Sequence, residues 1–161
     1  MAELIESKTS VLDDVKIAVV TSRFNKPVTE KLEEGALQRL KELGFRDDQV
    51  VFTRVPGALE VPFAIQNLLL AGCDGAVALG AVIRGETTHY EYVCESVERA
   101  LTHLQLDLNK PIASGVLTTE NGEQAYARIG GNKGHKGKEA AEVLVEMLNF
   151  KRQIQDGLPG K

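Results

Sequence analysis

The chain has few of the residues that usually mark a metal, disulfide or membrane protein. Its 161 residues include no tryptophan, two cysteines and three histidines. Cys73 and Cys94 stand alone without a CxxC spacing, so we expect two reduced packing thiols in a cytoplasmic protein. His89, His103 and His135 share no metal-ligand spacing, and we therefore expect no metal site.

Long apolar runs and an excess of positive charge are also missing. No run approaches the roughly 20 residues of a membrane span, and the N-terminus lacks the pattern of a signal peptide. Lys and Arg number 19 against 23 Asp and Glu, a net charge of −4 that argues against general nucleic-acid binding. We expect one globular domain over residues 1–161, with an N-terminal arm (1–14) and a frayed tail (152–161).

Short apolar runs alternate with amphipathic segments along the chain. The apolar runs predict strands at residues 15–21, 50–55, 75–83 and 111–119. Helical spacing predicts helices at about 27–43, 62–71, 88–108, 122–128 and 138–151. Strands separated by helices pair in parallel through right-handed crossovers. The predicted fold is therefore a flavodoxin-like, three-layer α/β/α sandwich with a four-stranded parallel sheet.

Ligands of such folds bind outside the carboxyl ends of the strands. Four segments of this chain follow predicted strands, namely residues 22–25, 57–60, 84–89 and 118–120. We expect the functional residues among them.

The segment after the third strand carries the most chemistry. Thr88 and Glu91 match a capping box, which places His89 in the first turn of a helix. The helix dipole there disfavours a protonated imidazole, so His89 suits proton transfer. The amides of Gly85, Glu86 and Thr87 lie at the same helix start and suit a phosphate. The alternative is a capped helix with an incidental surface histidine.

Three further residues are candidates, each with a simpler alternative. Glu60 suits hydrogen bonds from hydroxyls or ring N–H groups, or it merely complements a helix dipole. Phe24 suits stacking on a planar ring, or it folds back into the core. Arg128 suits a phosphate, or it is a solvated surface residue. The segment Gly130–Lys138 fails the P-loop spacing, but as a basic loop it suits an anion or a neighbouring subunit.

Read together, these segments resemble the 6,7-dimethyl-8-ribityllumazine synthase family. The matching stretches keep one order from about residue 16 to residue 150, and they are Ser22–Asn25, Val55–Pro62, Leu79–Tyr90 and Gly115–Arg128. The family condenses 5-amino-6-ribitylaminouracil with 3,4-dihydroxy-2-butanone 4-phosphate, the penultimate step of riboflavin biosynthesis. The resemblance implies a transferase that needs two small-molecule substrates and no cofactor.

The resemblance also implies a role for each candidate. Phe24 stacks on the pyrimidine ring, and His89 is the catalytic proton shuttle. The remaining substrate-binding residues hold the ribityl chain (Ala58, Leu59, Glu60), the pyrimidine edge (Ala81, Val82, Ile83) and the phosphate (Glu86, Thr87, Arg128).

Two positions depart from the family pattern, and both bear on assembly. Ser114 stands where the family usually has an aromatic that reaches the adjacent subunit's site, and His135 replaces an asparagine in the glycine loop. The resemblance implies a homopentamer with shared sites, a sixty-subunit shell as its end state, and riboflavin synthase as a partner. Two other readings stay open: a flavodoxin-like binding protein without turnover, and a paralogue kept for assembly.

Overall fold

The computed structural model describes residues 1–160. Its main sheet has the strand order β2-β1-β3-β4, and every neighbouring pair is parallel. The strands are β1 (Ile17–Ser22), β2 (Val50–Val55), β3 (Gly75–Ile83) and β4 (Ile112–Thr119). The predicted four-stranded parallel sheet is confirmed, and the bounds of β2 and β3 match the prediction.

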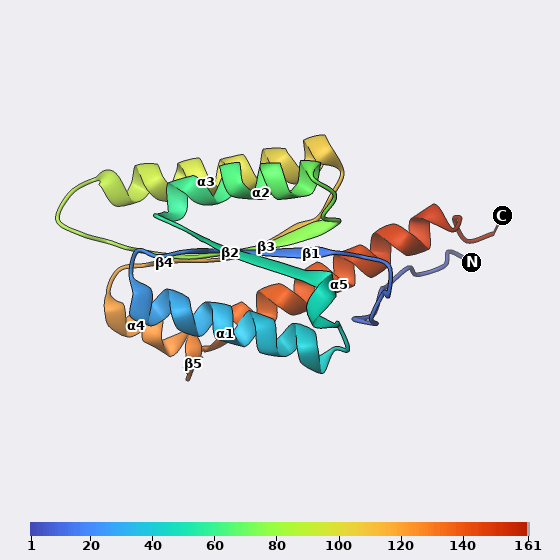
Figure 1. Cartoon of the computed structure of the whole chain (residues 1–161), viewed down its shortest axis with the longest axis horizontal. Coiled ribbons are helices and arrows are strands. Elements are labelled where there is room, and N and C mark those ends of the chain that lie inside the picture. The colour runs from blue at the N-terminus through green and yellow to red at the C-terminus, as the bar shows by residue number, and fades with distance from the viewer. Residues whose placement is uncertain (161) are drawn as a thin grey trace.

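Helices cover both faces of this sheet (Figure 1). On one face lie α1 (Lys26–Glu42), α4 (Gly122–Ala127) and α5 (Lys136–Gln155). On the other lie α2 (Val61–Leu70) and α3 (His89–Leu108). Two short 3-10 turns, η1 (Asp47–Gln49) and η2 (Ala58–Glu60), precede β2 and α2. The predicted three-layer α/β/α sandwich is thus confirmed.

The central strand β1 shows why the sheet is buried on both sides. Its side chains alternate, so that Ile17 and Val19 pack towards α1 and α5. Ala18 and Val20 pack towards α2 and α3. All six residues of β1 are buried because helices cover both faces and strands flank both edges.

The glycine-rich segment after α4 is a hairpin rather than the predicted loop. It contains β5 (Ile129–Gly131) and β6 (Gly134–His135), which pair antiparallel. The last helix, α5, begins at Lys136, two residues before its predicted start, because the His135 side chain caps its N-terminus. It ends at Gln155, so residues 152–155, which we expected in the frayed tail, are helical.

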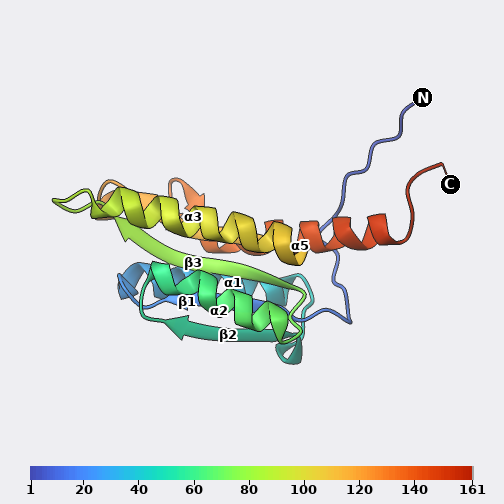
Figure 2. The ribbon, with the colours of Figure 1, turned by 90° about the horizontal axis from the view of Figure 1, so that it is seen from above.

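The N-terminal arm crosses the C-terminal half of α5 (Figure 2). Ser7 Oγ donates to Gln153 Oε1 at 3.1 Å, and Arg152 pairs with Asp14 through contacts of 2.9 and 3.0 Å. The guanidinium of Arg152 lowers the pKa of the Asp14 carboxyl. These contacts explain why α5 continues past its predicted end. Within residues 1–160, no helix combines the length and apolar character that crossing a membrane requires.

Candidate active site

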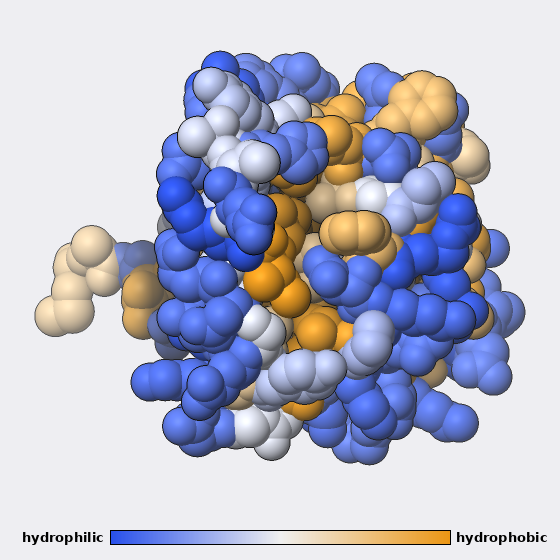
Figure 3. Space-filling model, turned by 90° about the vertical axis from the view of Figure 1, so that its left-hand side faces the viewer, coloured by the Kyte–Doolittle hydropathy of each residue, from blue (hydrophilic) through white to orange (hydrophobic). Residues whose placement is uncertain are grey.

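An open cleft of about 440 Å³ lies at the carboxyl edge of the sheet. Figure 3 looks onto this edge and shows a hollowed apolar strip bordered by hydrophilic residues. We call it the apolar cleft, and its lining residues are Phe24, Asn25, Gly57, Ala58, Leu59, Glu60, Ala81, Val82, Ile83, Gly85, Thr87, His89, Tyr90 and Val93. It lies where the strand order reverses around β1, the position at which open α/β sheets bind ligands.

The loop between β1 and α1 places an aromatic ring at the cleft. Asn25 has a left-handed backbone with φ of 65°, and its side-chain amide donates to the carbonyl of Ala81 at 3.0 Å. The N–H of Phe24 donates to the carbonyl of Pro56 at 3.1 Å. These bonds hold the loop against β3 and the end of β2, and the Phe24 side chain is 70% exposed. The alternative in which Phe24 folds into the core is therefore wrong.

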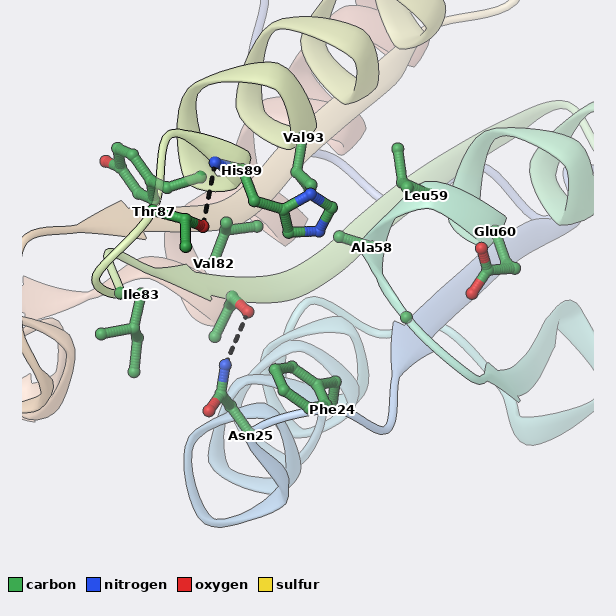
Figure 4. Close-up of a pocket in the computed structure, with 14 residues that line it drawn as sticks. Phe24, Asn25, Ala58, Leu59, Glu60, Val82, Ile83, Thr87, His89 and Val93 are labelled. Carbon is green, nitrogen blue, oxygen red and sulfur yellow. Dashed lines mark hydrogen bonds between the residues drawn. The ribbon is translucent and has the colours of Figure 1, made fainter.

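The loop between β2 and α2 adds a carboxylate. The turn η2 buries Ala58 and leaves Leu59 and Glu60 exposed. A Cβ placed on Gly57 would lie 3.2 Å from Glu60 Oε1, so the carboxylate lies close against the Gly57 backbone. Figure 4 shows Phe24, Glu60 and His89 reaching the cleft from three different elements.

The loop between β3 and α3 supplies the histidine. His89 is the first residue of α3, as predicted, but the predicted capping box does not form. Thr88 has helical backbone angles (φ −75°, ψ −1°), whereas a capping residue needs an extended backbone to turn its hydroxyl onto the helix amides. The neighbouring Thr87 acts instead, since the His89 N–H donates to Thr87 Oγ1 at 3.3 Å. Thr87 therefore fixes the start of α3.

Arg84 connects this loop to its surroundings. Its guanidinium lies 3.1 Å from Glu91 on α3 and 3.6 Å from Glu120 beyond β4. It also lies over the Tyr90 ring, 5.5 Å from the centroid. Because these groups are largely exposed, the ion pairs contribute little to stability. They connect the start of this loop to α3 and to the residue that follows β4.

The structure does not bring every predicted residue to the apolar cleft. Glu86 is exposed and does not line it, although Gly85 and Thr87 do. Arg128 lies in a second cleft of about 360 Å³, which we call the cationic cleft. The residues that line the cationic cleft are Val116, Leu117, Thr118, Thr119, Arg128, Lys133, Lys136 and Glu139. Arg128 Nη1 donates to the carbonyl of Gln124 at 2.7 Å, which anchors the guanidinium there.

Ser114 lies in neither cleft. It is opposite Ala78 in the β3–β4 register, and its hydroxyl donates to Glu98 on α3 at 3.2 Å. Asn25, Tyr90 and Val93 also line the apolar cleft, and none of them was a named candidate, although Asn25 belongs to the expected segment 22–25. For Asn25 a signal existed, because asparagine adopts a left-handed backbone more readily than most residues do.

The fold and the two clefts define a class: a flavodoxin-like α/β protein whose small-molecule site lies at the carboxyl edge of a parallel sheet. Comparison with known proteins narrows this class. The profile of the family described as 6,7-dimethyl-8-ribityllumazine synthase matches residues 14–152. The chain therefore belongs to the 6,7-dimethyl-8-ribityllumazine synthase family.

Individual relatives agree with this assignment. The 6,7-dimethyl-8-ribityllumazine synthase of Bdellovibrio bacteriovorus is 54% identical over 140 residues, which cover 87% of this chain and 77% of that protein. The enzyme of the same name from Coxiella burnetii is 46% identical over 87% of this chain and 93% of its own. That of Helicobacter hepaticus is 43% identical over 94% of this chain and 97% of its own.

Proposed function

We propose that the apolar cleft of one chain and the cationic cleft of a neighbouring chain together form the active site of a lumazine synthase. The chain condenses 5-amino-6-ribitylaminouracil with 3,4-dihydroxy-2-butanone 4-phosphate to 6,7-dimethyl-8-ribityllumazine, the penultimate step of riboflavin biosynthesis. The observation that carries the shared-site proposal is that His89 and Arg128 line two different clefts of the same chain.

The pyrimidine substrate fits the apolar cleft. We assign its ring to the face of Phe24, which is exposed and held by the bonds of its loop. Ala81, Val82 and Ile83 at the end of β3 would contact the ring edge. The ribityl hydroxyls would donate to the Glu60 carboxylate, with Ala58 and Leu59 beneath the chain.

His89 lies where a proton must move. The substrate amine attacks the ketone and loses water to give an imine, inorganic phosphate leaves, and ring closure releases a second water. Each step transfers protons between nitrogen, carbon and oxygen, and a histidine open to solvent can both take and return them. Positioning supplies much of the rest, since well-oriented reactants gain up to about 7–11 kcal/mol.

The phosphate needs hydrogen-bond donors and positive charges around it. The amides of Glu86 and Thr87 precede the N-terminus of α3, a 20-residue helix whose dipole favours an anion there. Arg128, Lys133 and Lys136 supply the positive charges, and only Glu139 in the cationic cleft opposes them. A phosphate between the two sets would bind both chains at once.

Assembly follows from the same arrangement. A ring of chains that places each apolar cleft beside a neighbour's cationic cleft is a head-to-tail interface, which closes only at a fixed rotation. We assign a homopentamer as the minimal active unit, with a sixty-subunit shell as its end state. The family resemblance supports riboflavin synthase as a partner and the cytoplasm as the location.

Mixed oligomers test the shared site directly. The variants His89→Ala and Arg128→Ala are each expected to be poorly active alone. When the two are co-expressed in equal amounts, about a quarter of the interfaces combine an intact His89 with an intact Arg128, and activity returns accordingly. Light scattering gives the size of each species. An active monomer would contradict the shared site, whereas an active isolated pentamer would contradict only the shell.

Removal of the stacking ring tests the pyrimidine assignment. Phe24→Ala is expected to raise KM for the pyrimidine substrate roughly twofold to tenfold, because stacking contributes about 0.5–1.5 kcal/mol beyond burial. KM for the phosphorylated ketone should change less. Phe24→Leu keeps the bulk and removes the ring, so it should behave like Phe24→Ala. A leucine variant with unchanged KM would show that the ring does not stack.

A further inference from the structure

His135 occupies a space that two glycines leave open between α1 and α5. A Cβ placed on Gly35 of α1 would lie 2.1 Å from His135 Cε1, far inside contact distance. A Cβ on Gly137 of α5 would lie 3.1 Å from the same atom. The imidazole therefore packs directly on the backbone of both helices, and no larger residue at position 35 is compatible with it.

The ring also makes a specific hydrogen bond. His135 is the N-cap of α5, with an extended backbone, and its Nδ1 accepts the N–H of Lys138 at 3.3 Å. A ring nitrogen accepts a hydrogen bond only when it carries no proton. The cap therefore exists in the neutral imidazole and is lost in the imidazolium.

The segment that His135 holds carries the charges of the cationic cleft. His135 pairs with Ile129 across the β5–β6 hairpin. The N–H of Lys136 donates to the carbonyl of Arg128 at 2.8 Å, and the N–H of Lys133 donates to the carbonyl of Ala127 at 2.9 Å. Arg128, Lys133 and Lys136 thus belong to one short hydrogen-bonded unit that includes His135.

We propose that His135 is a positioning residue for phosphate binding: the unprotonated Nδ1 of its ring, placed by packing on Gly35 and Gly137, caps α5 and so holds the hairpin such that Arg128, Lys133 and Lys136 face one anion. The inference rests on the proposed function, because it takes the cationic cleft to be the phosphate site. It adds that protonation of His135, which itself does not touch the substrate, weakens phosphate binding at acidic pH.

The charges around the ring set the direction of its titration. Burial and then the ammonium of Lys138 on α5 lower the pKa of His135 below the ordinary value of 6.5, while Glu139 on α5 and Glu34 on α1 oppose them. The ring is therefore neutral at neutral pH. As pH falls below 6.5, the unfolded chain takes up this proton before the folded chain does. The stability that neutral His135 contributes is complete above that window and declines as pH falls through it.

Two substitutions separate positioning from charge. His135→Asn keeps an acceptor on the γ carbon, where Nδ1 was, but does not titrate. His135→Gln moves the acceptor one bond further out and loses the cap. The dissociation constant of inorganic phosphate and KM for the phosphorylated ketone would be measured for wild type and both variants from about pH 5 to about pH 8. The dissociation constant of the wild type divided by that of His135→Asn, at each pH, cancels the ionisation of the phosphate and of every group that the two proteins share.

This ratio should be near one at neutral pH and rise to about fivefold at the acidic end, the size expected for a lost helix cap. His135→Gln should bind phosphate about fivefold more weakly at every pH, with KM for the pyrimidine unchanged. Gly35→Ala, which expels the ring, should match His135→Gln. A flat ratio, or one that falls below one because the imidazolium attracts phosphate, would overturn the proposal. If no lumazine forms at all, the proposed function fails, and the phosphate constants still decide the role of His135.

Discussion

Replacement of His89 by alanine is expected to lower kcat by roughly 10²–10⁴-fold, the usual contribution of a positioned general acid or base. His89 is the first residue of α3 and lines the apolar cleft, so removal of its imidazole takes away the group that we propose as the proton shuttle. The fold should be unaffected because the side chain is exposed. Steady-state kinetics with saturating substrates measure the effect. Since the condensation is chemically easy, positioning alone should leave a measurable residual rate.

A matched control lies on the same helix. His103 is an exposed histidine of α3 that does not line the apolar cleft, so His103→Ala should keep the wild-type kcat. A His89→Ala enzyme whose turnover stays within about a factor of two of wild type would remove His89 from proton transfer. Phosphorylated-ketone binding without any lumazine formation in the wild-type protein would favour the binding-protein reading instead.

Replacement of Arg128 by alanine should mainly weaken binding of the phosphorylated ketone. A lost charge-assisted hydrogen bond costs about 1.5–3 kcal/mol, which corresponds to a rise in the dissociation constant of roughly tenfold to a hundredfold. Affinity for the pyrimidine should change far less. Arg128→Lys should recover only part of the loss, because an ammonium cannot reproduce the planar fork of the guanidinium. Titration with each substrate separately measures both affinities.

The control for Arg128 must account for its structural contact. Arg128 also donates to the carbonyl of Gln124, so the thermal midpoint of each variant should be measured alongside its affinities. Arg99→Ala removes an exposed arginine of α3 outside both clefts and should leave both affinities unchanged. Equal losses for the two substrates in Arg128→Ala would assign this residue a structural role.

The local sequence pattern predicts much of the fold. The run Gly75–Ile83 has almost no polar side chain, and it forms β3 with those bounds at the centre of the sheet. The position of His89 at the start of a helix was likewise predictable. The exposure of Phe24 was not, because the sequence left a position in the core equally open. The predictable features depend on residues that are neighbours in sequence. A strand buried on both faces needs a continuous apolar run, and a helix start is indicated by the residue types of its first turn.

The tertiary structure alone decided how the candidate residues are grouped. The family resemblance grouped Arg128 with the amides of Glu86 and Thr87 at one phosphate. Within one chain the fold puts Arg128 and Thr87 in separate clefts, because the hairpin after α4 lies on the α1–α5 side of the sheet and α3 lies on the other. The Asn25 contact with Ala81 joins residues that are 56 positions apart, which no local pattern encodes. Capping depends on backbone angles rather than on residue type, so the prediction of Thr88 as the capping side chain was wrong and Thr87 acts instead. Distances between remote segments and the backbone angles of single residues are fixed only when the layers pack. These distances and angles determine which side chains line each cleft.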